Sequence, residues 1–318
     1  MRKYIFGPVP SRRLGMSLGI DIVPAKVCSL DCVYCEVGKT TNLSIERDIF
    51  FDVQELFAEI EDYFNHHPDP DYITFSGSGE PTLNAKINDI LAFIKDKRPH
   101  VPVAILTNGT LLSHQIVRSS IMAADLVLPS LDAATEKTFK RINRPHKSID
   151  LKSHIQGLID FRQEYSGMIY LEVFILPGYN DNIVDLLALK DVLLKINPKE
   201  IHLNTLDRPG LLPSLRSATR EELERIRELW AMKNIVIISS PQGWTNLTTQ
   251  GDDALTTIME TISRRPCTLE DLTQLLGMHV NEVNKYLRIL KEKKQIEIFS
   301  QDRGIFYKKL LNAQDTPS

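Results

Sequence analysis

Short apolar runs alternate with amphipathic helical patterns along the first 240 residues. Seven of these runs are nearly continuously apolar, which is typical of parallel strands that are covered on both faces. They predict strands at residues 17–23, 71–77, 103–109, 126–132, 169–176, 200–206 and 235–239. Repeated βα units imply a parallel sheet. Because six or seven units do not complete an eight-stranded barrel, we expect an α/β fold with a partial (βα)6-type parallel barrel or an open sheet.

The pattern changes after residue 250. Residues 252–263 have a helical pattern, a second helix begins after Thr268 and ends at Gly277, and residues 280–293 predict a third helix. Residues 295–300 and 304–308 then predict a hairpin. We therefore expect an α/β domain at residues 1–250, a small winged-helix domain at residues 251–312 and a disordered tail at residues 313–318.

Composition narrows the class of protein. The 318 residues are 42% hydrophobic and 25% charged, which is ordinary for a globular protein and excludes a fibre or a disordered chain. No apolar run approaches the roughly 18 residues of a membrane span, and Pro8, Pro10, Arg12 and Arg13 interrupt the N-terminus where a signal peptide needs an apolar core. We expect a cytoplasmic protein that does not contact the membrane.

Charge adds two local features. The net charge of -3 argues against a generally basic nucleic-acid-binding surface. Residues 2–13 nevertheless carry four Lys or Arg and no acid, and residues 280–310 carry eight Lys or Arg and four acids. Each stretch is open to two interpretations, a binding surface or a solvated face.

Three of the four cysteines lie close together. Cys28, Cys32 and Cys35 form a CxxxCxxC loop after the first predicted strand, whereas Cys267 lies in the other predicted domain. Three thiolates can bind three irons of a cubane cluster and leave the fourth iron open to a substrate. The alternative is a structural zinc site, which needs a fourth ligand that the loop does not supply at the usual spacing.

Polar motifs follow the next predicted strands, at the edge where βα folds assemble their sites. They are Ser76-Gly77-Ser78-Gly79-Glu80-Pro81, Leu106-Thr107-Asn108-Gly109, Pro129-Ser130-Leu131-Asp132, and Asn204-Thr205-Leu206-Asp207-Arg208. Glu172 interrupts an apolar strand that ends at Leu176, and a carboxylate that points inward there needs a partner. Alternatives remain open, since Gly79 suits a tight turn and since Ser130 and Asp132 suit helix capping, which we favour slightly for Asp132.

The cysteine spacing and these motifs resemble the radical S-adenosylmethionine superfamily over the first 210 residues. The resemblance implies that Cys28, Cys32 and Cys35 bind a 4Fe-4S cluster whose open iron chelates S-adenosylmethionine. It implies cofactor contacts from Tyr34, Gly77, Gly79, Glu80, Asn108, Ser130, Asp132 and Leu176. The substrate-side candidates are Arg12, Arg13, Asn204, Asp207 and Arg208.

Residues 6–15 and the later motifs resemble the branch grouped with the tRNA wyosine synthetases, often described only as iron-sulfur oxidoreductases. The chain has no cysteine before Cys28, so it lacks the cysteines for the second cluster of those synthetases. The implied reaction is reductive cleavage of S-adenosylmethionine to a 5'-deoxyadenosyl radical that takes a hydrogen atom from a substrate. Such chemistry needs a low-potential donor such as flavodoxin or ferredoxin.

Three functions stay open at this point. The first is modification of an RNA base, which the branch and the basic stretches favour. The second is modification of a peptide or protein. The third is a DNA-binding redox regulator whose third C-terminal helix enters the major groove. The number of cofactor motifs argues against the regulator, because a redox sensor needs the cysteines but not Glu80 or Asn108.

Overall fold

The computed structural model describes residues 2–212, 214–238, 252–301 and 303–310. Within these, the chain divides into two compact units. The barrel unit contains residues 2–206 and 210–240, and the C-terminal unit contains residues 207–209 together with residues from 241 onward. The domain boundary that the sequence predicts at residue 250 and the predicted tail both lie outside the described residues.

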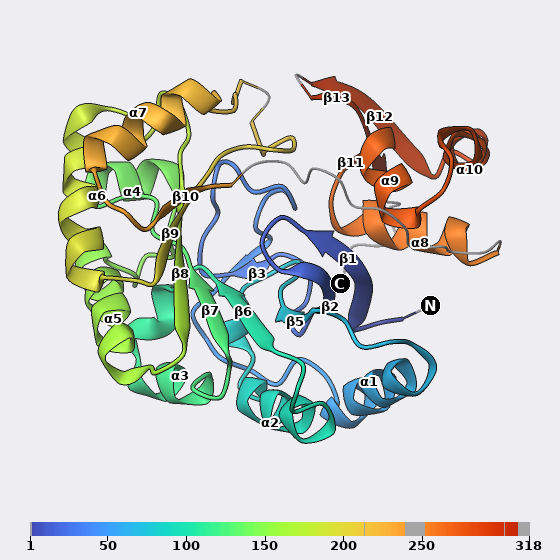
Figure 1. Cartoon of the computed structure of the whole chain (residues 1–318), viewed down its shortest axis with the longest axis horizontal. Coiled ribbons are helices and arrows are strands. Elements are labelled where there is room, and N and C mark those ends of the chain that lie inside the picture. Colours follow the sequence, from blue (N-terminus) through green and yellow to red (C-terminus); the bar gives the residue numbers. More distant parts are fainter. Residues whose placement is uncertain (1, 213, 239–251, 302, 311–318) are drawn as a thin grey trace. The chain divides into compact units, whose positions relative to one another are not determined.

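The barrel unit is built on one eight-stranded sheet (Figure 1). Its strands, in spatial order, are β1 (Ile5–Ser11), β2 (Gly15–Ile20), β5 (Tyr72–Phe75), β6 (Val103–Thr107), β7 (Leu126–Pro129), β8 (Met168–Phe174), β9 (Glu200–Asn204) and β10 (Ile235–Ile237). All neighbours from β2 to β10 are parallel and follow chain order. The α/β fold with a parallel sheet is therefore confirmed.

β1 is a correction to the sequence prediction, which contains no strand there, and it pairs antiparallel with β2. Its sequence contains Gly7, Pro8 and Pro10, which ordinarily indicate a turn. Proline lacks the backbone N–H of a ladder bond, but a strand at the edge of a sheet tolerates that loss. β1 is such an edge strand.

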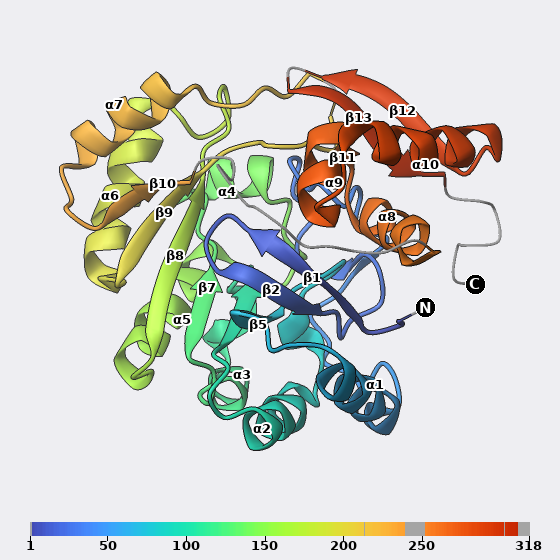
Figure 2. The same cartoon turned by 45° about the vertical axis from the view of Figure 1, so that its right-hand side comes forward.

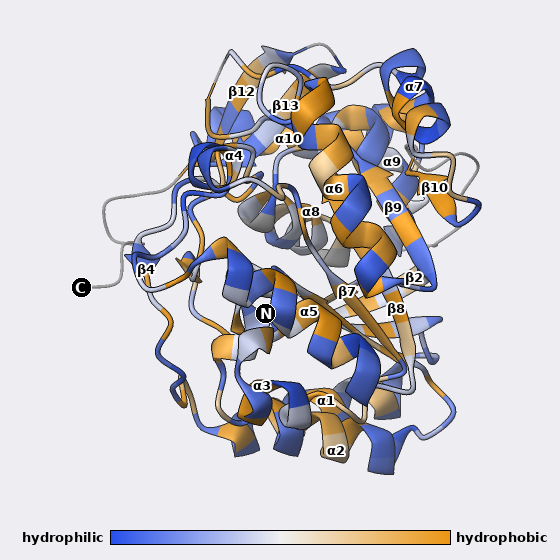
Figure 3. Cartoon of the chain, turned by 90° about the vertical axis from the view of Figure 1, so that its left-hand side faces the viewer, coloured by the Kyte–Doolittle hydropathy of each residue, from blue (hydrophilic) through white to orange (hydrophobic). Residues whose placement is uncertain are grey.

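Helices cover the outside of this sheet. They are α1 (Val53–His66), α2 (Ile87–Lys97), α3 (Gln115–Ser120), α4 (Glu136–Ile142), α5 (Leu151–Glu164), α6 (Ile183–Ile196) and α7 (Arg220–Trp230). Two 3-10 turns, η1 (Pro81–Leu83) and η2 (Thr110–Ser113), and a short strand pair, β3 (Val27–Cys28) with β4 (Asn42–Leu43), complete the unit. Figure 3 shows apolar residues along β7 and β8, whereas α5 and α6 carry polar residues as well.

The two faces of the sheet bury different residues. Alternate positions such as Ile105, Val127 and Leu171 join the large core beneath the helices. The opposite positions Ala104, Leu126 and Leu128 form a smaller apolar cluster with Leu14 on the inner face. Further toward the carboxyl ends of β8 and β9, this inner face becomes polar.

The C-terminal unit contains three helices and a three-stranded antiparallel sheet. Its elements are α8 (Asp252–Arg264), β11 (Cys267–Thr268), α9 (Leu269–Leu276), α10 (Val280–Glu292), β12 (Ile296–Gln301) and β13 (Gly304–Lys309), which Figure 2 shows from a second direction. The sheet order is β11, β13, β12. The helices and the hairpin agree with the sequence prediction, which lacks β11. The element order is the one expected of a winged helix, and that assignment stays a prediction.

Local sequence explains the ends of these helices. Thr268 and Asp271 form a capping box at the start of α9, and Gly277 ends it with a φ of 61°. Cys267 is buried in the core of this unit, consistent with its separation from the other cysteines. No described helix is both long and apolar enough to span a membrane.

Candidate functional site

The three clustered cysteines lie in the segment after β2, where Cys28 ends the short strand β3 and Cys32 and Cys35 follow in a loop. All three are unpaired and half-buried. Burial raises the pKa of the Cys28 thiol to about 12 and raises the pKa of Cys32 well above its usual value.

The number and kind of donors bear on which metal group the cysteines could hold. Among the described residues, no three His, Cys, Asp or Glu side chains converge to hold one metal ion. A structural zinc takes four protein ligands, whereas a cubane can take one thiolate on each of three irons and leave the fourth iron open. The donor set of Cys28, Cys32 and Cys35 fits such a cubane.

The loop after β5 packs directly on the cysteine loop. Glu80 N donates to Val27 O at 3.0 Å, and Lys26 N donates to Ser78 O at 2.9 Å. A Cβ on Gly79 would lie 2.3 Å from Val27 O, so only glycine permits this approach. Glycine at position 79 is thus required by close packing on the cysteine loop, and its predicted contact with the cofactor stays a prediction.

Gly77, in the loop after β5, permits a close approach of Asp21. A Cβ there would lie 2.1 Å from Asp21 Cγ. The Asp21 carboxylate accepts hydrogen bonds from Ser78 N at 3.1 Å and from Ser78 Oγ at 3.0 Å. Asp21, which the sequence did not single out, therefore orients the turn that precedes Glu80.

Glu80 is buried and connects the ends of β5 and β6. Its carboxylate accepts from Thr82 N and Oγ1 at 3.1 and 2.6 Å, from Thr107 Oγ1 at 2.6 Å and from Asn108 N at 2.7 Å. Burial raises its pKa, and the four donors oppose that rise. The side chain predicted to contact the cofactor thus also holds the two loops together.

Asn108 connects β6 to the cysteine loop. Its Oδ1 accepts from Thr110 N and Oγ1 at 3.0 and 2.8 Å. Its Nδ2 donates to Ser29 Oγ at 2.8 Å and approaches Cys28 Sγ at 3.5 Å. Asn108 therefore lies beside a cluster cysteine, and its predicted contact with S-adenosylmethionine stays a prediction.

Asp132 does not cap a helix, which corrects the alternative that the sequence favoured slightly. The N-cap of α4 is Thr135. Asp132 is instead buried and accepts from Tyr34 OH, from Asn143 Nδ2 at 2.7 Å and from Phe174 N at 2.9 Å. Burial raises its pKa, and these three donors oppose the rise. The carboxylate holds Tyr34 of the cysteine loop, so its role as a cofactor ligand stays a prediction.

The Tyr34 ring stacks on Phe174 at the end of β8, with 3.9 Å between ring centroids and 9° between planes. Ser130 lies at the end of β7 and forms an isolated bridge with Glu172 on β8. Leu176 is fully buried after β8, and its N donates to Asn180 Oδ1 at 2.8 Å. These three predicted cofactor residues therefore all lie at the carboxyl ends of β7 and β8 or in the facing loop.

Three of the substrate-side candidates meet on the inner face of the sheet. Arg12 Nη1 donates to Asn204 Oδ1 at 3.2 Å, and Asn204 Nδ2 donates to Glu172 Oε2 at 3.2 Å. Arg13 forms an ion pair with the same Glu172 carboxylate. We call Arg12, Arg13, Glu172 and Asn204 the inner polar cluster. Glu172 thereby has the partner that its position required.

Arg13 is the most buried cation of this cluster. Burial, and then the neighbouring charge of Arg12, lower its pKa to about 9. Arg12 makes no ion pair among the described residues, and its contact with Asn204 uses one of its five N–H groups. The cluster therefore retains unused hydrogen-bond donors.

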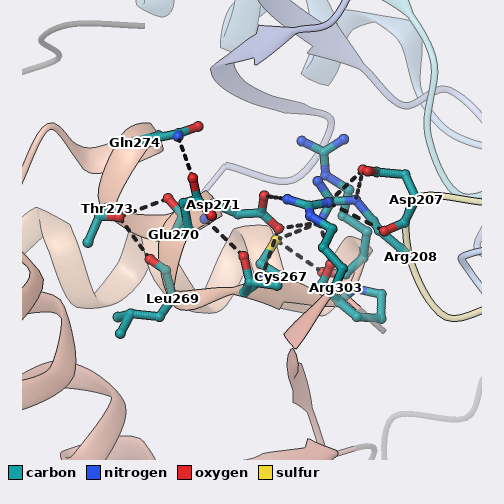
Figure 4. A network of polar contacts seen from close by, with 12 residues as sticks. Asp207, Arg208, Cys267, Leu269, Glu270, Asp271, Thr273, Gln274 and Arg303 are labelled. Atoms are coloured by element: carbon teal, nitrogen blue, oxygen red, sulfur yellow. Dashed lines mark hydrogen bonds and ion pairs between the residues drawn. The ribbon is translucent and has the colours of Figure 1, made fainter. Parts of the chain in front are cut away.

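Asp207 and Arg208, which the sequence grouped with Asn204 as substrate-side candidates, pair with residues of the C-terminal unit, and their substrate role stays a prediction. They belong to the C-terminal unit, where Figure 4 shows their network. Arg208 Nη1 donates to Asp271 Oδ2 at 2.9 Å and to Pro266 O. Arg303 Nη1 donates to Asp207 Oδ2 at 2.6 Å and pairs through Nη2 with Asp271. Their charges are thus engaged in a local ion-pair network.

The sequence pattern of the radical SAM superfamily matches residues 22–189. This stretch contains the cysteine loop, the Gly79 and Glu80 turn, Asn108, Asp132 and Leu176. The chain belongs to the radical SAM superfamily. Its cofactors are accordingly a 4Fe-4S cluster and S-adenosylmethionine, and it is an enzyme of that superfamily.

Curated relatives place this radical SAM chain among proteins of the UPF0026 group. A UPF0026 protein of Helicobacter pylori (strain J99) is 33% identical over 300 residues, covering 92% of this chain and 94% of that protein. One from Methanocaldococcus jannaschii is 38% identical over 234 residues, covering 73% and 71%. A protein of Brachyspira hyodysenteriae described as GTPase Obg is 36% identical over 91% of this chain, which spans 43% of that protein.

Solved structures support the fold. A radical SAM methyltransferase from Sphaerobacter thermophilus superimposes with a TM-score of 0.55 at 14% identity, covering 71% of this chain and 67% of that chain. SuiB of Streptococcus suis, bound to its precursor peptide SuiA, gives a TM-score of 0.52 at 12% identity, covering 70% and 48%. At these identities the similarity concerns the fold alone.

Proposed function

We propose that this radical SAM enzyme removes a hydrogen atom from an RNA base. A donor such as flavodoxin or ferredoxin would reduce the bound cluster. The bound cofactors would then supply a 5'-deoxyadenosyl radical from S-adenosylmethionine. The protein's part is to hold the cofactors, orient the substrate and exclude water. The inner polar cluster is the observation that carries the proposal.

Its position suits a substrate that must approach the cofactors. Asn204 is paired in register with Phe174, whose ring stacks on Tyr34 of the cysteine loop. Glu172 lies two residues before Phe174 on the same strand. A group bound by Asn204 and Glu172 would therefore lie next to Phe174, the residue on which Tyr34 of the cysteine loop stacks.

The chemistry of the cluster suits a nucleotide. Base edges present donors and acceptors, which an amide and a carboxylate match, and a guanidinium fork matches a phosphate. Arg12 is the member with spare donors. In this proposal Asn204 and Glu172 orient the base, Arg12 holds a phosphate, and Arg13 neutralises Glu172.

Exposed cations of the C-terminal unit support binding of a longer RNA. Lys285, Arg288 and Lys291 lie on α10, and Lys294 follows it; all four are exposed. Arg288 pairs with Glu292 of the same helix, an exposed contact that a phosphate can replace. These residues are candidates for sequence-independent contacts with the RNA backbone.

The experiment measures binding of total RNA at several salt concentrations, with anaerobically prepared protein. A variant that changes these four cations to Gln should lower the log-log salt slope by about 0.7 for each lost contact with single-stranded RNA. Its uncoupled cleavage of S-adenosylmethionine should equal that of the wild type. A matched control changes four exposed lysines of the barrel unit to Gln: Lys137, Lys152, Lys195 and Lys199.

A peptide or protein substrate is the second candidate. SuiB, whose fold is similar, was solved with a precursor peptide. Ile298 on β12 and Ile305 on β13 are 38% and 53% exposed, which suits contact with a polypeptide. Unchanged RNA affinity and unchanged slope in the four-cation variant would refute the RNA contacts and favour this candidate.

A further inference from the structure

Each of the three cluster cysteines receives a side-chain N–H from outside the CxxxCxxC motif. Asn108, after β6, donates Nδ2 to Cys28 Sγ at 3.5 Å. Asn143, at the end of α4, donates Nδ2 to Cys32 Sγ at 3.5 Å. Lys26 donates Nζ to Cys35 Sγ at 3.3 Å. Because the donors come from three separate segments, turns within the motif do not account for them.

Lys26 differs from the two asparagines because it carries a positive charge. Its backbone is fixed on both sides: its N donates to Ser78 O at 2.9 Å, and its O accepts from Thr41 N and Asn42 N, each at 3.1 Å. It also has a φ of 66°, which an L-residue adopts only when its surroundings hold it there. Among the described residues no carboxylate pairs with Lys26, so its ammonium group is directed at the cysteine sulfur.

Asn143 is fixed just as firmly. It is buried, and its Nδ2 is shared between Cys32 Sγ and Asp132 Oδ2, the latter at 2.7 Å. Asp132 in turn holds Tyr34, the residue before Cys35. The donor to Cys32 is thus part of the network that shapes the cysteine loop.

Such contacts change the electrostatics of reduction. A cluster that gains one electron becomes more negative, and N–H donors and cations near its thiolates stabilise the more negative state. We propose that Lys26, Asn108 and Asn143 raise the reduction potential of the cluster, and that Lys26 contributes most because it adds a full charge. This inference rests on the cofactors of the superfamily and is independent of the proposed RNA substrate.

The test compares Lys26→Met with Lys39→Met in anaerobically reconstituted protein. Lys39 lies four residues after Cys35 and is exposed, and within the described part of the chain the only lysine hydrogen bond to a cysteine sulfur is that of Lys26. The Lys39→Met variant therefore loses the same charge without losing an N–H···S contact. The readout is the midpoint potential from a dithionite titration followed by electron paramagnetic resonance. No turnover is required.

We expect the midpoint potential of K26M to lie about 59 mV below that of the wild type. For one electron, this corresponds to a tenfold higher ratio of oxidised to reduced cluster at the wild-type midpoint. K39M should match the wild type, and Lys26→Arg should stay close to it. Lys26→Gln keeps an N–H donor without the charge, so its midpoint potential should lie between those of K26M and the wild type. It replaces K26M in the test if K26M loads little iron. Equal midpoints for K26M or K26Q and the wild type, or equal shifts in K26M and K39M, would overturn the proposal.

Discussion

Gly79→Ala tests whether the packing of the two cofactor loops is as tight as the structure describes. The new Cβ would lie 2.3 Å from Val27 O, 3.1 Å from Val23 Cγ1 and 3.3 Å from Pro24 O. Two of these three atoms belong to the backbone and cannot rotate away. The backbone of Gly79 is not in the left-handed region, so the clash is the main cost of the substitution.

The magnitude follows from two effects. Overpacking a tight contact costs about 1–3 kcal/mol. Displacing the loop also weakens the 3.0 Å bond from Glu80 N to Val27 O, worth about 0.5–1.5 kcal/mol. The sum is about 1.5–4.5 kcal/mol, which would lower the affinity for S-adenosylmethionine about 10- to 1,600-fold if the closed loops are required for binding.

The assay is equilibrium dialysis of S-adenosylmethionine against anaerobically reconstituted protein, together with urea unfolding of the same variants. Gly178→Ala is the control, because Gly178 has a φ of 81° but no atom within 4 Å of its built Cβ. That control loses only about 1–2 kcal/mol, for the left-handed backbone. If G79A binds S-adenosylmethionine as well as G178A does and is as stable, the steric reasoning is wrong.

Three further predictions follow from the same contacts. Replacing any cluster cysteine with Ala should abolish iron loading to about four irons and formation of 5'-deoxyadenosine, whereas Cys267→Ala should leave iron analysis unchanged. Burial raises the pKa of Asp132, so protonation of its carboxylate favours the folded state. The free energy of unfolding, measured by urea titration, should therefore fall as pH rises through that raised pKa. Tyr34→Phe removes a hydrogen-bond donor to Asp132 and should move this fall to higher pH. Glu172→Gln leaves Arg13 buried without its counter-charge and should cost about 3–5 kcal/mol in urea unfolding, and the double change of Arg13 and Glu172 to Gln should recover part of that loss.

Local sequence order explains why most of the sheet is predictable. Buried parallel strands are continuous apolar runs, and the polar residue that ends each run lies at the carboxyl edge of the sheet. The order of residues therefore predicts that Glu80 and Asn108 lie at this edge, and the family resemblance makes them candidates for the site. β1 is not predicted in this way, because its prolines and glycine indicate a turn. A strand tolerates these residues there only because β1 lies at the edge of the sheet.

Contacts between distant residues are not predictable in the same way. Arg13 and Glu172 are 159 residues apart, and Asn143 and Cys32 are 111 apart. The sequence indicates that Glu172 needs a partner, but alternation along a strand identifies the face of a residue and not the residue opposite it. Those pairings depend on strand order and loop paths, which the pattern of apolar positions does not specify.

Asn204 and Asp207 show where the rule of strand ends stops applying. Both follow the same apolar run, and the sequence predicts both at one substrate edge. Asn204 is the last residue of β9 and stays on the inner face through its register with Phe174. Beyond the strand no ladder bond fixes the chain, so the side chains go where their charges find partners. Arg208 is 8% exposed, and a buried guanidinium requires acids, which Asp207 and Asp271 supply within the C-terminal unit. Strand register therefore identifies the face on which a side chain lies up to the last paired position, and beyond it the pairing of buried charges decides.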